Sequence, residues 1–446
     1  MAGTTLEERI DIFESGEKGE ASWRTARRLP IRQRTVQKWR RRGRLFGRAG
    51  LHSQMGRPKT GALGSYSIEM SDAIRRWRRE NPGWGALTLR TELALREAFQ
   101  GQKLPSRATI ARFLKEEGFI AAREPSVELP NGASGQIDHA HQLWELDARG
   151  YEQVPDVGMV TLINLNDRFT HARLLSYPCW LGQSRVERHA NTEDYQACLR
   201  LAFMQWGLPE AIQLDHESVF YDNTSRSPFP TRFHLWLTAL GVSMTLIRVH
   251  QPKDQGMTER SHQLWHQQVV QGHTFADWSA LYSALENRRS FLNYNLPCRT
   301  LGDRPPLVAY PEATHAGIHY YLDAEAEMLD LDRVFRYLAL GHWFRRISQS
   351  GTLSLDRQIY CLGTEWKRQQ AEINFDADLH QLRFFNEAGD LISARPIKGI
   401  TKEALMGDIA DLSLLPAFQM MLPLDWAPQQ NARLFETINV HDLMRL

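Results

Sequence analysis

Apolar and polar positions in the first 125 residues repeat with the spacing of helices. The pattern predicts helices over residues 7–15, 22–28 and 33–42, and a second set over residues 68–80, 87–99 and 106–118. Val36 and Trp39 give the last helix of the first set an apolar side, and Ser106 is a suitable N-cap for the last helix of the second. Each set is predicted to fold as a helix-turn-helix unit, with a plain three-helix bundle as the alternative.

The pattern changes after residue 137, where short apolar runs alternate with helical stretches. Strands are predicted over 142–147, 159–164, 172–176, 211–214 and 243–249, and helices over 192–206, 231–240 and from about residue 256. In the helix at 192–206, apolar residues recur at steps of three and one, which is typical of an amphipathic helix. The order β-β-β-α-β-α-β-α is that of a ribonuclease-H-like domain.

A third pattern begins after residue 333. Five short strands are predicted over 351–355, 357–362, 370–376, 381–386 and 391–397, which together favour a small β-barrel. The predicted fold is therefore multidomain α+β. It comprises a helix-turn-helix domain (1–55), a basic linker (56–66), a second helical DNA-binding domain (67–125), an α/β ribonuclease-H-like core (137–275), a helical connector (276–332), a small β-barrel (333–400) and a C-terminal tail (401–446). The tail is apolar and is expected to dock either on a partner or on the chain's own barrel.

Positive charge is concentrated near the N-terminus, although the net charge is only +2. Residues 1–125 hold 26 Lys and Arg against 14 Asp and Glu, and residues 21–68 hold 13 basic residues and no acidic one. Solvated surfaces usually carry charges of both signs. This one-sided basic run therefore favours double-stranded DNA as a partner, and an ordinary solvated surface is the alternative. The candidate DNA contacts are Arg34, Lys38, Arg40, Arg41, Arg42, Arg44, Arg57, Lys59, Arg107 and Arg112. Arg57 is expected either to enter a minor groove or to be part of a plain basic linker.

The remaining composition narrows the class of protein. No apolar stretch reaches the length of a membrane span, and the acidic start does not resemble a signal peptide, so no membrane partner is expected. The four cysteines are far apart and have no zinc-ligand spacing, which indicates reduced thiols. We expect a cytoplasmic protein that associates with the nucleoid if its source is bacterial.

Three acidic residues are the candidate catalytic groups. Asp147 and Asp215 end two apolar runs, and Glu259 lies near the start of the last predicted helix. Three convergent carboxylates suit two Mg²⁺ ions, with Mn²⁺ as a substitute, and would serve phosphoryl transfer on nucleic acid. Each residue also has a structural alternative, as a turn, cap or surface group. Glu217 and Asp222 are interpreted as acidic neighbours, and Asp167 as a turn residue.

The motifs around the trio resemble those of the integrase-like D-D-E transposases of insertion sequences and retroviruses. The matching segments are Trp144-Glu-Leu-Asp147, Asp215-His-Glu-Ser-Val-Phe220 and Gln251-Pro-Lys-Asp-Gln-Gly-Met-Thr-Glu259-Arg260. The chain departs from the family in having His216-Glu217 in place of Asn-Gly. Asp215 and Glu259 are also 44 positions apart, a separation that suggests an inserted loop at 221–230.

The resemblance implies a DNA transposase that binds element ends, cleaves them to free 3′-OH groups and joins these to target DNA. It also implies Asp147, Asp215 and Glu259 as metal ligands and a homo-oligomer on DNA, and it leaves open whether a helper ATPase takes part. The alternatives are a catalytically inactive, transposase-derived DNA-binding or architectural protein, and a nuclease that cuts without joining.

Overall fold

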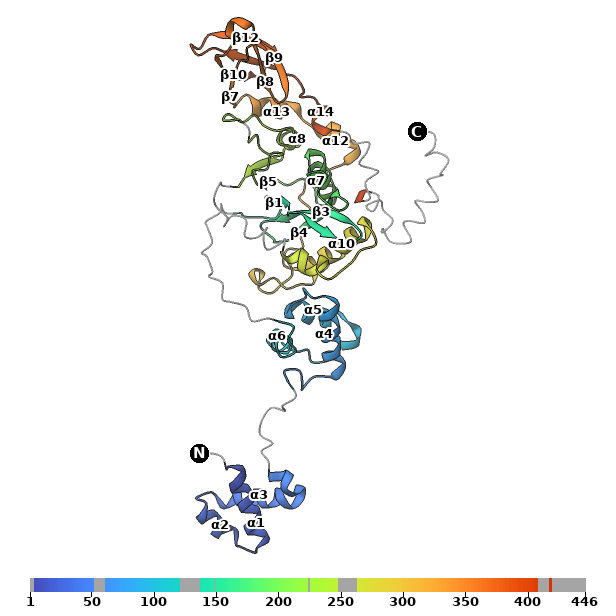
Figure 1. The fold of residues 1–446 in the computed structure, drawn as a ribbon, viewed down its shortest axis with the longest axis vertical. Helices are drawn as coiled ribbons and strands as arrows, with labels where there is room; N and C mark the ends of the chain where they lie inside the picture. Colours follow the sequence, from blue (N-terminus) through green and yellow to red (C-terminus); the bar gives the residue numbers. More distant parts are fainter. Residues whose placement is uncertain are drawn as a thin grey trace, which may run out of the picture.

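The computed structural model describes residues 4–51, 61–120, 137–148, 150–223, 225–247, 263–407 and 417–418. Two helical units, a mixed α/β core and a C-terminal β region follow one another along the long axis of the molecule (Figure 1). Among the described residues, no helix has the length and apolar character needed to cross a membrane.

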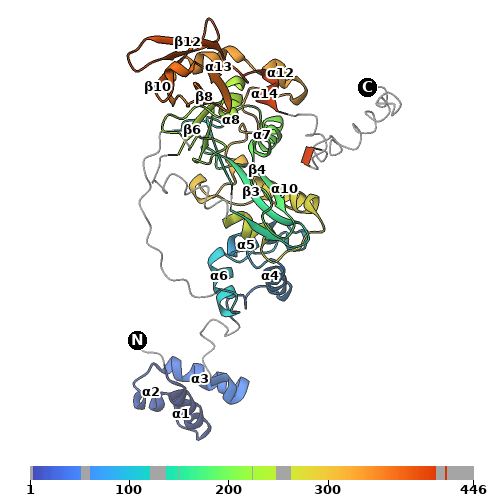
Figure 2. The same ribbon diagram turned by 45° about the horizontal axis from the view of Figure 1, so that its top comes forward.

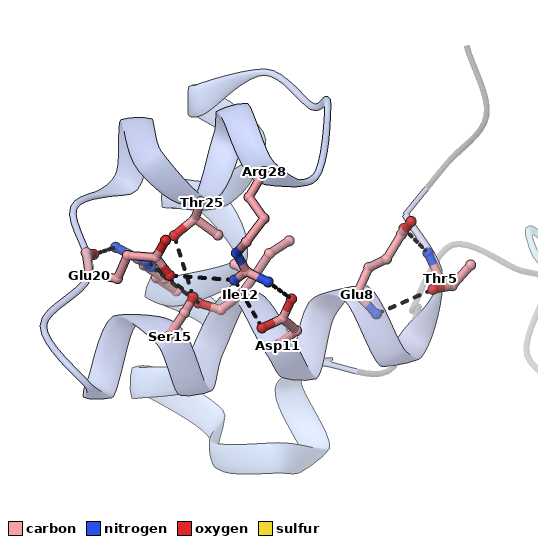
Figure 3. Close-up of polar contacts among 9 residues, drawn as sticks. Thr5, Glu8, Asp11, Ile12, Ser15, Glu20, Thr25 and Arg28 are labelled. Atoms are coloured by element: carbon pink, nitrogen blue, oxygen red, sulfur yellow. Dashed lines mark hydrogen bonds and ion pairs between the residues drawn. The ribbon is translucent and has the colours of Figure 1, made fainter.

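The N-terminal unit contains the three predicted helices. They are α1 (Leu6–Glu17), α2 (Ser22–Arg28) and α3 (Gln33–Phe46), followed by the short η1 (Gly47–Leu51). Thr5 and Glu8 form a reciprocal capping box at the start of α1 (Figure 3). Ile12, Val36 and Trp39 are buried between the helices, so the apolar positions of the sequence do form the core of this unit.

The second unit also has three main helices. They are α4 (Ile68–Glu80), α5 (Ala86–Leu95) and α6 (Arg107–Glu116), with the short η2 (Glu97–Phe99) between the last two. Ser106 caps α6, because its side chain accepts a hydrogen bond from the backbone N–H of Thr109. Ile74, Leu89 and Leu114 lie at the centre of its core. A DNA-binding role for either unit stays a prediction.

The core is built on one mixed sheet. Its strands are β1 (Leu143–Ala148), β2 (Glu152–Val154), β3 (Gly158–Asp167), β4 (Arg173–Gly182), β5 (Ala211–Leu214) and β6 (Ser243–Leu246). β3 is antiparallel to β1, β2 and β4, whereas β5 runs parallel to both β1 and β6. The predicted strands and helices occur in order as far as β6, but the short β2 between the first two predicted strands is not predicted from the sequence. The start of the following predicted helix lies outside the described residues.

Helices cover both faces of this sheet. α7 (Thr192–Trp206) and α8 (Arg232–Leu240) pack on one face in the largest apolar cluster. α10 (Trp278–Tyr294) and the π-helical turn η4 (His266–Val270) pack on the other, where Val160 and Leu162 contact their apolar side chains. α5 approaches the α10 side (Figure 2).

Short helices connect the core to the C-terminal region. They are η5 (Arg299–Leu301), α11 (Pro306–Ala309), η6 (Leu322–Ala324), α12 (Glu325–Met328) and α13 (Leu331–Leu338). Glu325 is fully buried and accepts hydrogen bonds from Arg200 of α7, Trp236 of α8 and Tyr320. This buried carboxylate therefore fixes the connector to both helices of the core.

The C-terminal region contains all five predicted strands, but they do not close a barrel within the described residues. β12 (Leu391–Pro396), β11 (Gln381–Phe385), β10 (Gln370–Asp376) and β7 (His342–Arg346) form a four-stranded sheet. β8 (Thr352–Leu355) and β9 (Gln358–Cys361) pair only with each other. The short η7 (Thr364–Trp366) and α14 (Lys402–Met406) complete the region. The strand β7 is not predicted from the sequence. The predicted closed barrel is corrected to two separate sheets, one of four strands and one of two.

Candidate active site and DNA-binding surface

Asp147 and Asp215 lie at the carboxyl ends of two adjacent parallel strands. The pairing of β1 with β5 places Glu145 opposite Gln213, and each aspartate lies two residues beyond this pair. Because parallel strands keep their register, the two carboxyl groups leave the sheet at the same edge. The sheet thus brings together two of the three predicted catalytic residues.

Asp147 is surrounded by other acidic groups and is largely buried. Burial raises the pKa of Asp147 to about 7, and the negative charges of Asp215, Glu217 and Glu145 act in the same direction. Burial also raises the pKa of Asp215, although a hydrogen bond from the backbone N–H of Glu217 opposes this rise. Buried carboxylates that repel one another are stabilised by a bound cation.

The donor set fits a hard divalent cation, because carboxylate oxygens are the ligands that Mg²⁺ prefers. Within the described parts of the chain, no three His, Cys, Asp or Glu side chains are grouped closely enough to hold a metal ion. The third predicted ligand, Glu259, lies outside the described residues. His266 is described, and its Nδ1 lies 2.6 Å from Oε1 of Glu152 on β2, so it faces a neighbouring strand.

Glu217 is closer to the candidate site than its interpretation as an acidic neighbour implies. Its backbone N–H donates to Oδ1 of Asp215 at 3.0 Å, and its Oε2 accepts from the Tyr195 hydroxyl at 2.8 Å. Tyr195 belongs to α7 and is almost completely buried. An Asp side chain often accepts a hydrogen bond from the backbone N–H two residues later, in an Asx turn. The presence of Asp215 two residues before Glu217 is therefore the sequence signal for this contact. The apolar spacing of the helix at 192–206 predicts that Tyr195 is buried, but no sequence pattern predicts its contact with Glu217.

The other acidic residues nearby have structural partners. Asp167 is buried and accepts hydrogen bonds from the backbone N–H groups of His141 and Thr170, which supports its interpretation as a turn residue. Asp222 forms an ion pair with Arg345 of β7 at 3.6 Å. The loop that follows Asp215 is therefore attached to the C-terminal sheet.

The basic side chains of α3 divide into an exposed set and one buried member. Arg34, Lys38 and Arg41 are exposed and follow one another at i, i+4 and i+7, on the side opposite the buried Val36 and Trp39. Arg44 is also exposed, and Arg42 is half-buried with its guanidinium 5.0 Å from the centre of the Trp39 ring. On α6, Arg107 and Arg112 are exposed. Arg57 and Lys59 lie outside the described residues.

Arg40 does not belong to this surface. It is 8% exposed, and its guanidinium donates to the carbonyl oxygens of Ile12 and Glu20 and to the hydroxyls of Ser15 and Thr25. Figure 3 shows these acceptors facing the same point inside the unit. Because Arg40 holds α1, α2 and α3 together, we remove it from the candidate DNA contacts.

Comparisons with known proteins give structural likeness at low sequence identity. No family model matches the chain. The catalytic core domain of BIV integrase matches with 17% identity and a TM-score of 0.27, over 39% of this chain and 95% of that one. The HTLV-2 integrase catalytic core domain in complex with magnesium matches with 13% identity and a TM-score of 0.27, over 37% of this chain and 93% of that one. A simian T-cell lymphotropic virus intasome in complex with the PP2A regulatory subunit B56 gamma matches with 12% identity and a TM-score of 0.32, over 62% of this chain and 83% of that chain.

Proposed function

We propose that the protein is a DNA transposase of the D-D-E type, which binds element ends, frees their 3′-OH groups and joins them to target DNA. The observation that carries this proposal is the position of Asp147 beside Asp215, at the ends of two adjacent parallel strands. Burial and the neighbouring charges of Asp215, Glu217 and Glu145 raise the pKa of Asp147, which supports this proposal. Carboxylates whose pKa is raised by burial together with neighbouring charge cluster at functional sites, which supports a cation-binding role for Asp147.

Asp147 and Asp215 are the described residues that would hold the metal ions, and we assign Glu259 as the third ligand. Bound Mg²⁺ would lower the pKa of a water or 3′-hydroxyl and neutralise charge on the phosphate. The chain's own part is to fix the ligands. β1 and β5 set the separation of the two aspartates, and the Glu217 N–H orients the carboxylate of Asp215. Reaction by direct displacement at phosphorus needs no covalent intermediate with the protein.

DNA recognition is assigned to the two helical units. The exposed stripe of Arg34, Lys38 and Arg41 presents three positive charges in one row, which suits contact with phosphates. Arg107 and Arg112 give α6 a second basic surface. Since an element has two ends that must be joined to one target, we propose that the form active on DNA is a homo-oligomer.

The test uses labelled duplexes taken from the DNA on both sides of the protein's own gene, because a mobile element carries its transposase gene between its ends. With Mg²⁺, the full-length protein should give nicked and then joined products. Asp147→Asn, Asp215→Asn and Glu259→Gln should each abolish both products and leave DNA binding nearly unchanged. Asp222→Asn is the matched control, because Asp222 follows Asp215 closely in the chain but pairs with Arg345.

Each failure has a distinct meaning. Joining that persists in one acidic variant removes that residue from the site. If the wild-type protein binds the duplexes and yields no product with Mg²⁺ or Mn²⁺, the catalytically inactive DNA-binding alternative is favoured. Nicked products without joined ones indicate a nuclease.

A further inference from the structure

A cavity of about 410 Å³ lies between the core and the C-terminal region. The loop after Asp215 lines one side of it with Phe220 and Tyr221, and β6 contributes Met244 and Leu246. α8, α13 and β7 close the other sides, and Figure 1 shows α8 beside α13. The volume lies within the range of pockets that hold small organic groups, roughly 300–1,000 Å³.

The cavity begins next to the candidate active site. Leu246 is paired with Leu214 across β5 and β6, and the N–H of Ile247 donates to the Leu214 carbonyl at 2.9 Å. Asp215 is the next residue after Leu214. Tyr221 also lies near this point, since its ring is 5.5 Å from the ring of His216. A DNA strand bound at the two aspartates would therefore bring a neighbouring nucleotide close to the cavity.

The walls of the cavity are aromatic. Phe220, Phe229 and Trp343 are buried, and the rings of Phe229 and Trp343 are 4.7 Å apart between centroids. Tyr337 and Leu340 of the α13 side are exposed by 37% and 82%. The deep part of the cavity is thus buried and apolar, whereas this rim is open to solvent.

Two polar groups at the cavity have no partner among the described residues. Within the described residues, the ring nitrogens of His234 and the hydroxyl of Tyr337 form no hydrogen bond with the protein. The centroids of the two rings are 4.9 Å apart. Burial lowers the pKa of His234 to about 4, so its imidazole is neutral at pH 7. A neutral imidazole offers one donor and one acceptor, and a phenol offers both. A nucleobase edge carries matching donors and acceptors.

We propose that this cavity takes one unpaired nucleobase of the DNA strand that reacts at Asp147 and Asp215. The inference rests on the proposed function for the identity of that strand. A base supplies a flat face for the aromatic walls and a polar edge for His234 and Tyr337, whereas an apolar peptide side chain would displace water from both polar groups without replacing its hydrogen bonds. Arg345 lies two residues after Trp343, on the same side of β7, where it pairs with Asp222 and donates to the carbonyl oxygen of Ser227.

The first experiment detects the base directly and requires no knowledge of the element ends. A forked duplex carries 5-iodouracil in its unpaired arm, next to the junction, and is irradiated with full-length protein without divalent metal. Cross-links should map to Tyr221, His234 or Tyr337, with yields that fall several-fold when the same 5-iodouracil is paired. Leu340→Trp narrows the rim at an exposed position, so it should give a lower cross-link yield with the unpaired 5-iodouracil than the wild-type protein gives. Cross-links only outside the cavity, or yields that pairing does not change, would overturn the inference.

The second experiment separates a role in base extrusion from a merely structural one. Tyr337→Leu removes the aromatic face but keeps an apolar side chain, and Tyr294→Leu is the control at another exposed tyrosine. Tyr337→Leu should slow cleavage of fully paired DNA about tenfold, the loss expected for one base–aromatic stack. A mismatch at the extruded nucleotide should restore most of the rate, because the base no longer has to be unpaired. A defect that the mismatch does not repair would show that Tyr337 acts only through the fold.

The two proposals fail in different ways. Cross-linking in the cavity without any cleavage or joining by the wild-type protein would contradict the transposase and leave the base site standing. Normal joining without cross-links in the cavity would contradict the base site alone.

Discussion

The backbone N–H of Glu217 donates a hydrogen bond to Oδ1 of Asp215 at 3.0 Å. The same residue receives a hydrogen bond from Tyr195 on its side-chain carboxylate. Glu217 thus links a buried tyrosine of α7 to the carboxylate of Asp215. This link fixes the loop after β5, where the chain departs from the Asn-Gly of the resembled family.

We expect Glu217→Gln to reduce strand joining several-fold without abolishing it. The backbone hydrogen bond to Asp215 remains in this variant, and the amide oxygen still accepts from Tyr195. The lost charge is one of those that raise the pKa of Asp147, so this pKa should fall. In a pH–rate profile, the acidic limb should therefore move to lower pH. An unchanged profile would show that the Glu217 charge does not reach Asp147.

The stability of the metal-free protein should depend on the ionisation of Asp147. Its pKa is raised from 3.8 to about 7 on folding, chiefly by burial. The favourable contribution of the neutral carboxyl is complete below pH 4 and is lost as pH rises towards 7. Asp147→Asn stays neutral, so its free energy of unfolding should exceed that of the wild type by up to about 4 kcal/mol above pH 7, at about 1.4 kcal/mol per pKa unit.

Thermal melting in a chelator between pH 4 and 8 measures this difference. The two proteins should melt alike at pH 4 and diverge as the pH rises, while Asp378→Asn, at an exposed position, should follow the wild type throughout. Added Mg²⁺ should raise the melting temperature of the wild type at pH 8 and have little effect on Asp147→Asn. Parallel curves at all pH values would contradict the buried, charge-repelled carboxyl.

The exposed stripe on α3 should determine how DNA binding responds to salt. Alanine at Arg34, Lys38 and Arg41 together should reduce the slope of log affinity against log salt by roughly one unit per lost phosphate contact. Arg383→Ala, at a partly exposed arginine of the C-terminal sheet, serves as the control. Fluorescence anisotropy with full-length protein over a series of salt concentrations measures the slope. An unchanged slope would mean that this stripe does not face DNA.

Arg40→Met should behave differently from the triple alanine variant. Removing the guanidinium takes away the hydrogen bonds from Arg40 to the hydroxyls of Ser15 and Thr25 and to the Glu20 carbonyl oxygen, while the Ile12 carbonyl oxygen still accepts from Ser15. Each buried group that stays unsatisfied costs about 1–3 kcal/mol. The N-terminal unit should therefore lose its cooperative melting transition, whereas the triple variant should keep it.

Periodicity predicted most elements, because apolar spacing decides which face of a helix or strand is buried. The helix at 192–206 matches α7 to the residue, and the strands at 211–214 and 370–376 match β5 and β10. β7 was missed because His342 and Arg346 give it polar ends, and Trp343 alone of its side chains is buried. The prediction of a closed barrel is wrong because the sequence signals for strands do not specify which strands pair. In the structure, β8 and β9 pair only with each other.

The candidate site was predictable to a smaller extent. Asp147 and Asp215 could be placed together because both end apolar runs that are predicted to be strands. The parallel pairing of β1 and β5 then brings the ends of these strands to the same edge of the sheet. Arg40 was misplaced because a basic residue in a basic run gives no sign of burial, which depends on acceptors from α1 and α2. Tyr195 and the aromatic cavity arise from contacts between segments far apart in the sequence, and no local pattern predicts them.

The attachment of the second helical unit to the core depends on Arg288 of α10. Its Nη1 donates to Oε1 of Glu92 on α5 at 2.9 Å, its Nε donates to Gln268 of η4, and its guanidinium lies 4.6 Å from the centre of the Trp84 ring. Arg288 and Glu92 are both less than a tenth exposed. A buried ion pair of this kind is strongly destabilising when broken on one side only, by about 3–5 kcal/mol.

We therefore expect Arg288→Met to lower the free energy of unfolding by that amount, and the double variant Arg288→Met with Glu92→Leu to recover much of it. The reason is that the double variant leaves no uncompensated buried charge at the junction. Urea unfolding measures the stability, and limited proteolysis between residues 61 and 137 reports release of the unit from the core. If the single variant is as stable as the double one, the pair does not hold the junction. If proteolysis is unchanged although stability falls, α5 stays attached to α10 through its apolar contacts alone.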